Sequence, residues 1–289
     1  MPFRRNEVKV SIYPGCSAHG TAKEYSQSIE AVSHALGIET QEIDDWSCCG
    51  ATSAHSTNYK LSVALPARNL MIAQKKGLDV MIPCAACFNR FKSAQHHLEK
   101  DKALRAEMES IIGAKFTDGI SIRNPIDIIA NDIGLDALAG KVVRKLEGLR
   151  PVSYYGCLLL RPPEVCEFDD YENPVLLDKI LAACGADVKK WSFKTDCCGG
   201  SLSISRTDIV AKMVNKLASM AKEAGANCIV TACPLCMANL DMRTEAGLKM
   251  PVFYFTELLA LAMGLPGPDK WFKLHITDPM PLVQSLKLM

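Results

Sequence analysis

Thirteen of the 289 residues are cysteine, and ten of these fall into two series with the same internal order. Each series has a lone cysteine, an adjacent pair followed by glycine, and a Cys-x-x-Cys motif. The members are Cys16, Cys48, Cys49, Cys84 and Cys87, and then Cys157, Cys197, Cys198, Cys233 and Cys236. In both series 34 residues separate the pair from the Cys-x-x-Cys motif. The recurrence indicates an internal duplication whose thiolates bind a soft metal or take part in redox chemistry.

The number of cysteines in each series bears on the kind of metal site. A structural zinc ion takes four ligands in a closed tetrahedron, so five cysteines leave one without a role, and adjacent cysteines fill two corners poorly. Iron–sulfur clusters prefer thiolate ligands. The sets therefore favour iron–sulfur clusters over zinc and over free or disulfide-exchanging thiols. Because the spacing usual for a cubane cluster is absent, we expect an unusual cluster.

Strand-like and helix-like runs alternate in each copy, and they must position the cysteines. We expect strands over residues 8–13, 38–43, 79–82, 152–155, 188–193 and 228–231, and helices over 22–36, 61–76 and 207–224. This alternation predicts an α/β fold of two tandem similar domains with parallel sheets and flanking helices, related by a pseudo-twofold repeat. All ten cysteines would lie at the carboxyl ends of strands, where such sheets bind ligands.

The Gly-Leu-Arg-Pro sequence at 148–151 interrupts regular structure and predicts a first domain over residues 1–148 and a second over 149–289. A stretch rich in Lys, Glu, Gln and Ala at 91–112 predicts a helical insertion in the first copy. Residues 271–289 are rich in apolar side chains. We expect part of this tail to dock a partner, the alternative being that it packs on its own domain.

Composition narrows the class of partner. Charged residues make up 22% of the chain and nearly cancel, at a net +1, so no basic stripe indicates nucleic acid binding. We find neither a membrane-spanning apolar segment nor an apolar signal region near the first residue. A cytoplasmic location is expected, because a chain so rich in cysteine without an export signal belongs where thiols stay reduced. The expected partners are proteins and small molecules.

The doubled pattern with Cys-Cys-Gly resembles the CCG-domain family. The similarity to the B subunits of the heterodisulfide reductases extends over nearly the whole chain and includes Tyr-Gly-Cys-Leu-Leu-Leu-Arg-Pro-Pro at 155–163 and His-Ile-Thr-Asp-Pro at 275–279. It implies that each five-cysteine set holds one non-cubane [4Fe-4S] cluster, and that a disulfide is reduced to two thiols between the two clusters. It also implies two partner subunits, one ferredoxin-like and one containing a flavin.

Two clusters suit this reaction, because cleaving a disulfide takes two electrons and a cluster commonly supplies one. Methanogen members of the family typically have His after the cysteine that opens the second copy, whereas Leu158 stands here. This difference argues against the coenzyme M–coenzyme B heterodisulfide and leaves another disulfide or a persulfide. Lys212 is a candidate to present a cation to an anionic substrate or a proton to a thiolate, and Arg161 is a weaker one. The alternative for both is an ordinary solvated side chain.

Three cysteines lie outside the repeated set. Cys184 and Cys228 are expected to be buried and to act as small apolar side chains. Cys166, in an acidic loop, is either exposed and oxidisable or passive. His19 and His55 lie near expected cluster loops, where a hydrogen bond to a ligand and a plain surface role both remain open.

Two other functions compete with disulfide reduction. In one, both clusters only relay electrons within a larger oxidoreductase; in the other, the chain is a scaffold with structural zinc. Two complete cysteine sets favour catalysis over the relay. Iron analysis would separate either iron–sulfur protein from the zinc scaffold.

Overall fold

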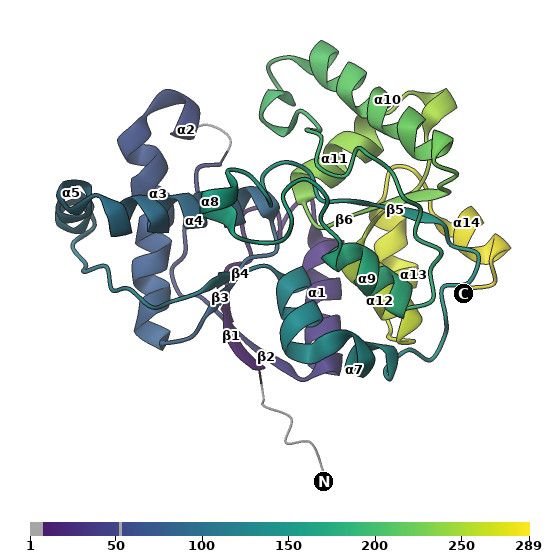
Figure 1. The fold of residues 1–289 in the computed structure, drawn as a ribbon, viewed down its shortest axis with the longest axis horizontal. Coiled ribbons are helices and arrows are strands. Elements are labelled where there is room, and N and C mark those ends of the chain that lie inside the picture. Colours follow the sequence, from purple (N-terminus) through teal and green to yellow (C-terminus); the bar gives the residue numbers. More distant parts are fainter. Residues whose placement is uncertain (1–7, 52–53) are drawn as a thin grey trace, which may run out of the picture.

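The computed structural model describes residues 8–51 and 54–289. Within these residues seven strands form two parallel sheets (Figure 1). The first sheet has the order β2-β1-β3-β4 and consists of β1 (Val8–Ile12), β2 (Ile38–Glu42), β3 (Val80–Met81) and β4 (Ile122–Arg123). The second has the order β5-β6-β7 and consists of β5 (Pro151–Tyr154), β6 (Cys228–Thr231) and β7 (Val252–Tyr254). The expected α/β class with parallel sheets is confirmed.

Helices connect the strands and cover both sheets. The first half contains α1 (Lys23–Leu36), α2 (Ala54–Thr57), α3 (Tyr59–Ala73), η1 (Gln74–Lys76), α4 (Ala85–Lys100), α5 (Lys102–Ile112), α6 (Pro125–Asp127), η2 (Ile128–Gly134) and α7 (Leu135–Ala139). The second half contains α8 (Pro163–Cys166), α9 (Leu176–Ala183), η3 (Gly200–Leu202), α10 (Thr207–Glu223), α11 (Pro234–Arg243), η4 (Ala246–Leu248), α12 (Phe255–Ala262), α13 (Pro268–Trp271), η5 (Phe272–Leu274) and α14 (Met280–Ser285).

The predicted insertion at 91–112 is helical, but it is divided between the end of α4 and α5. Asp101 lies at the division, and its side chain accepts hydrogen bonds from the backbone amides of Ala103 and Leu104, each at 2.9 Å. These bonds satisfy amides that have no partner at a helix start. The chain therefore begins a new helix at this point.

The prediction of a strand at 188–193 is wrong. The segment runs beside β5 and is bonded to it near its ends, where the Lys189 amide donates to the Pro151 carbonyl at 2.8 Å and the Tyr155 amide to the Lys194 carbonyl at 3.0 Å. Between these points the indole nitrogen of Trp191 donates to the carbonyl of Ser153 at 2.9 Å. The side chain thus takes the acceptor that a regular strand would need from β5.

The two halves exchange helices at the centre of the molecule. Helix α1 packs against α12, and α9 packs against α6 and α7. At the first contact the rings of Tyr25 and Tyr254 stack with centroids 4.1 Å apart, and the hydroxyls of Ser28 and Thr256 are 2.6 Å apart. Figure 1 shows α1, α9 and α12 between the two sheets. The buried apolar residues of both halves consequently form one cluster.

Most of the apolar tail packs on its own chain. Trp271, Phe272 and Val283 are buried, and the Trp271 indole donates to Gln27 of α1 at 2.8 Å. Two large apolar side chains of this segment, Leu274 and Ile276, remain exposed. The part of the tail available to a partner is therefore small.

Candidate functional site

The repeated cysteines collect at the carboxyl ends of the parallel strands. Cys16 follows β1 and Cys84 follows β3, while Cys157 follows β5 and Cys233 follows β6. The Cys-Cys-Gly turns lie on the loops that lead to α2 and η3. Parallel strands end at the same edge of a sheet, so three loops in each half deliver sulfur atoms to that edge.

Short distances between sulfur atoms join the motifs of each set. The Cys49 and Cys87 sulfurs are 3.2 Å apart, and those of Cys198 and Cys236 are 3.5 Å apart. In both sets the glycine amide of Cys-Cys-Gly donates to the sulfur of the first cysteine of the pair. Six of the ten cysteines are buried, whereas Cys16, Cys48 and Cys197 are exposed and Cys157 is half-buried.

A tyrosine fixes the Cys-Cys-Gly loop in each half. The Tyr13 hydroxyl donates to the Ser47 carbonyl at 2.9 Å, and the Tyr154 hydroxyl donates to the Asp196 carbonyl at 2.6 Å. Burial first, and then the neighbouring cysteine sulfurs, raise the pKa of both tyrosines. The hydroxyls therefore stay protonated and act as donors. The accepting carbonyl in each half belongs to the residue before the cysteine pair.

Glycine is required at two kinds of position near the sulfurs. Gly50 and Gly199 have φ of +73° and +78°, and a Cβ on Gly199 would lie 2.9 Å from a methyl carbon of Val210. Gly156 has φ of +69°, and a Cβ there would approach the Cys236 sulfur to 3.1 Å. These glycines allow the turns to form against the helices and the sulfurs.

The two sulfur sets meet across the pseudo-twofold arrangement. The thiols of Cys84 and Cys233 are hydrogen-bonded neighbours, and both are buried. Tyr25 holds the residues that precede them, because its hydroxyl lies 3.3 Å from the Pro83 carbonyl and 3.0 Å from the Ala232 carbonyl. The sets are therefore parts of one continuous sulfur-lined region.

Contacts between the thiols stabilise negative charge on particular sulfurs. Hydrogen bonds from Cys48 and Cys87 lower the pKa of Cys49 to about 4, although burial opposes them. A hydrogen bond from Cys157 lowers the pKa of Cys197 to about 6, again against burial. Sites that stabilise thiolates suit soft metals.

A cavity of about 100 Å³ is lined by all five cysteines of the second set. Its other walls come from both halves and consist of Ala51, His55, Ala85, Arg90, Tyr155, Leu158, Gly200, Ser201 and Leu235. Within the described part of the chain no three His, Cys, Asp or Glu side chains are arranged as ligands of a single metal ion. Five convergent thiols around one space fit the ligand preference of an iron–sulfur cluster.

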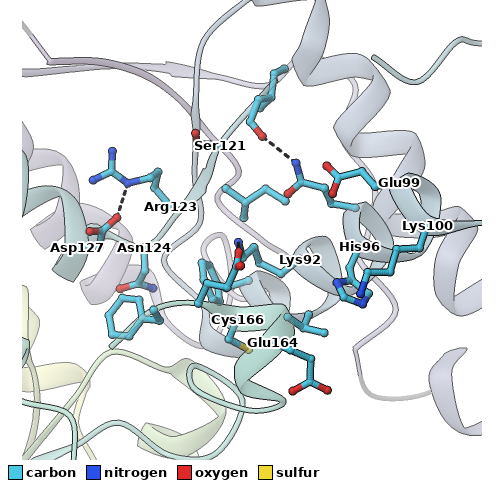
Figure 2. Close-up of a pocket in the computed structure, with 17 residues that line it drawn as sticks. Lys92, His96, Glu99, Lys100, Ser121, Arg123, Asn124, Asp127, Glu164 and Cys166 are labelled. Carbon is cyan, nitrogen blue, oxygen red and sulfur yellow. Dashed lines mark hydrogen bonds and ion pairs between the residues drawn. The ribbon is translucent and has the colours of Figure 1, made fainter. Parts of the chain in front are cut away.

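A larger cavity of about 550 Å³ lies between α4, β4 and α8 (Figure 2). None of the ten repeated cysteines lines it, and its one cysteine is Cys166. Two of its cations are paired, since Lys92 lies 3.2 Å from Glu167 and Arg123 contacts Asp127. We therefore place the candidate site at the smaller cavity.

The two proposed cationic side chains lie outside the wall of the sulfur-lined cavity. Lys212 is exposed on α10, and Arg161 is exposed with its guanidinium 3.2 Å from the Thr195 hydroxyl. Their proposed roles stay predictions. Arg90 and His55 line the cavity instead. The sequence analysis missed Arg90, because the equivalent position in the second copy is Asn239 and the repeat gave no signal there.

The environments of the remaining candidates differ. Cys184 and Cys228 are fully buried, which confirms the prediction, and burial raises the pKa of Cys184 to about 12. The alternative of an exposed Cys166 is wrong, because only 1% of it is exposed and burial raises its pKa to about 11. His19 is exposed and stacks on Trp46, with ring centroids 6.0 Å apart.

The model of the cysteine-rich domain family called CCG matches the chain twice, over residues 10–92 and 152–241. The chain belongs to this family. Both CCG matches contain a complete five-cysteine set, and each spans the strands and helices that carry it.

Proteins similar to this CCG chain align with it over almost their full length. It is 30% identical to the 8-methylmenaquinol:fumarate reductase membrane anchor subunit of Wolinella succinogenes, over 94% of this chain and 98% of that one. It is 28% identical to a protein of Archaeoglobus profundus that is like the heterodisulfide reductase B subunit, over 96% and 98%. It is 27% identical to the B subunit of the ferredoxin:CoB-CoM heterodisulfide reductase of Methanosarcina mazei, over 91% of each. These similarities support a subunit of the heterodisulfide reductase type.

Among solved structures, a hypothetical protein from Helicobacter pylori superposes with a TM-score of 0.73 at 10% identity, covering 93% of this chain and 52% of that one. At this identity the match shows a shared fold alone. No helix in the described part of the CCG chain has the length and apolar character needed to cross a membrane.

Proposed function

We propose that the chain is the catalytic subunit of a heterodisulfide reductase-type complex and reduces a disulfide or persulfide to thiols. The observation that supports this most directly is the contact between two complete sulfur sets at Cys84 and Cys233. One substrate sulfur pair placed at this junction would face both sets at once. A single set, or two distant sets, would offer no such arrangement.

Each five-cysteine set would hold one non-cubane [4Fe-4S] cluster, with the ligands assigned in the sequence analysis. When bound, the two clusters would supply the two electrons that reduction of a disulfide requires. The chain's own residues bind and orient. Tyr13 and Tyr154 hold the Cys-Cys-Gly loops in place, and the apolar side chains of Leu158 and Leu235 exclude water from the cavity.

The complex would contain a ferredoxin-like iron–sulfur subunit, which feeds electrons in, and a flavin-containing subunit that supplies them to it. This proposal rests on the relatives named for the B subunit of heterodisulfide reductases. On this chain the exposed Leu274 and Ile276 of the tail are the proposed contacts for a partner. We further propose a cytoplasmic location, since all thirteen cysteines are free thiols, and the two repeats as domains 1–148 and 149–289.

One relative favours a second function, in which the clusters only relay electrons. The Wolinella succinogenes protein aligns with nearly all of this chain but is a subunit of a fumarate reductase. In a relay the sulfur-lined cavity would bind no substrate. The two functions therefore differ in whether an added thiol changes the clusters.

The test uses the full chain purified without oxygen, with iron and acid-labile sulfide measured and an EPR spectrum recorded after a thiol is added to the oxidised protein. We expect about eight iron atoms per chain, as two four-iron clusters require, and a thiol-dependent signal. Cys198→Ala should lose about half of this iron, whereas Cys184→Ala, which removes an equally buried thiol outside the sets, should keep it.

The outcomes separate the three functions. A full iron content without a response to thiol would refute substrate reduction and leave the relay. Zinc in place of iron would overturn both and leave the scaffold.

A further inference from the structure

Among the described residues, Arg90 is the one side chain with a permanent charge in the wall of the sulfur-lined cavity. It comes from α4 of the first half, although the cavity is lined by the second cysteine set. It is half-buried, and the sulfur of Cys49 in the first set contributes to its electrostatic environment. The guanidinium therefore lies between the two sulfur sets, where the proposed function places the substrate.

A buried amide fixes the position of this guanidinium. The Asn89 side chain is fully buried and uses its nitrogen to donate to the Arg161 carbonyl at 2.8 Å and to the Cys166 sulfur at 3.3 Å. Its oxygen is then left to accept a hydrogen bond from Arg90. Because the remaining guanidinium donors are not used by this contact, they are available to a ligand.

Arg90 also breaks the repeat at a structurally equivalent position. The third residue after Cys87 is Arg90, and the third after Cys236 is Asn239. The Asn239 amide donates to the carbonyl of Cys198 at 3.0 Å, within its own set. The second half thus uses this position to hold a loop, whereas the first half places a positive charge there.

Arg90 differs from the cations of the larger cavity in having no acidic neighbour. Lys92 and Arg123 form ion pairs with carboxylates around that cavity, as Figure 2 shows for Arg123 and Asp127. In the described parts of the chain no carboxylate lies within ion-pair distance of Arg90. A half-buried guanidinium without a carboxylate is suited to bind an anion from outside the chain.

We propose that Arg90 forms an anion subsite, and that the sulfur substrate carries a fixed negative group such as a carboxylate, sulfonate or phosphate beside its sulfur atoms. This inference rests on the proposed function, since it takes the substrate to bind between the cysteine sets. The apolar side chains of Leu158 and Leu235 line the same cavity and would strengthen the interaction by excluding water. Asn89 is a positioning residue for the subsite.

The test titrates the oxidised holoprotein with two thiols that differ only in charge, 3-mercaptopropionate and 3-mercaptopropionamide, and follows the thiol-dependent EPR signal. We expect wild type to bind the carboxylate about 10- to 100-fold more tightly than the amide, or about 1.4 to 2.8 kcal/mol. Arg90→Met should remove this preference and leave the affinity for the amide unchanged. Arg90→Lys should keep part of it, because lysine retains the charge but not the fork of donors.

Arg150→Met is the matched control, because it removes an exposed arginine at the opposite end of β5 and should keep the full preference. Iron content is measured for each variant, so that loss of a cluster is not read as loss of the subsite. The cluster potentials are measured as well. A preference that survives Arg90→Met would overturn the inference, as would an equal loss of affinity for both thiols with a shifted potential, which would mean that Arg90 only balances cluster charge.

No response to either thiol in wild type would refute the proposed function itself. Equal responses to both thiols in wild type would refute only the anion subsite. The two failures are therefore distinguishable in one set of titrations.

Discussion

Tyr25→Phe tests whether one hydroxyl holds the two sulfur sets together. The hydroxyl is buried and lies within hydrogen-bonding distance of the carbonyls of Pro83 and Ala232, which precede the touching cysteines of the two sets. Phenylalanine keeps the ring that stacks on Tyr254. The substitution therefore removes the link between the loops without opening the helix interface around it.

The expected loss of stability follows from the two contacts. A buried hydrogen bond contributes about 0.5 to 1.5 kcal/mol, so losing both would cost about 1 to 3 kcal/mol. The Pro83 carbonyl keeps a bond from the Asn124 side chain at 3.2 Å, which reduces its share. We expect a loss of about 1 to 2 kcal/mol, and a melting temperature about 2 to 6 °C lower, for a chain of this size.

The assay is thermal unfolding of the holoprotein without oxygen, at one fixed scan rate and with iron content measured beforehand. Tyr59→Phe is the control, because its ring is 57% exposed and the substitution should change stability by less than about 0.5 kcal/mol. If Tyr25→Phe melts within the error of this control, the hydroxyl does not hold the loops and the reasoning fails.

Three further perturbations test other parts of the structure. Burial opposes but the hydrogen bond and charge of Glu257 raise the pKa of His275, so the pair's stabilisation is complete below the unfolded pKa of about 6.5 and is lost as pH rises through the folded value; urea midpoints should fall over that window in wild type, and a slope unchanged in His275→Gln would refute the pairing. Gly199→Ala should cost about 1 to 3 kcal/mol more than Gly77→Ala, which has a similar φ but no atom within 4 Å of the new Cβ, and equal urea midpoints would contradict the predicted collision. Trp191→Phe removes the indole donor to a β5 carbonyl and should cost about 1 kcal/mol, beyond the loss of ring area, in the same assay; stability equal to wild type would show that the bond contributes nothing.

The sequence was sufficient for the features that depend on local pattern. The motif order and the glycines after the cysteine pairs predicted the loops that carry sulfur, and the apolar spacing up to Gly37 predicted helix α1. Tyr13 and Tyr154 were within reach of the same reasoning, because each stands three residues before the lone cysteine of its copy. Their role was missed because hydrogen bonds to a distant loop leave no local signal.

Other features depend on contacts that no local pattern contains. The run at 188–193 has strand-like composition, but the Trp191 side chain competes for the carbonyl that a strand would use. Helix α1 has an obvious buried face, yet nothing in its sequence tells that the face meets α12 rather than its own sheet alone. Arg90 looks like one of many surface arginines until the fold places it beside the other half's cysteines.

The exchange of helices explains why duplication of a cysteine motif yields one site rather than two. If each half packed all its helices on its own sheet, the carboxyl edges of the sheets would have no fixed relation. Because α1 packs on α12 and α9 packs on α6 and α7, the two edges are fixed relative to one another by buried contacts. The same exchange brings Tyr25 of α1 to the loops before both Cys84 and Cys233. It follows that sequence changes in this interface, far along the chain from any cysteine, would alter the spacing of the sulfur sets and thereby the reaction between them.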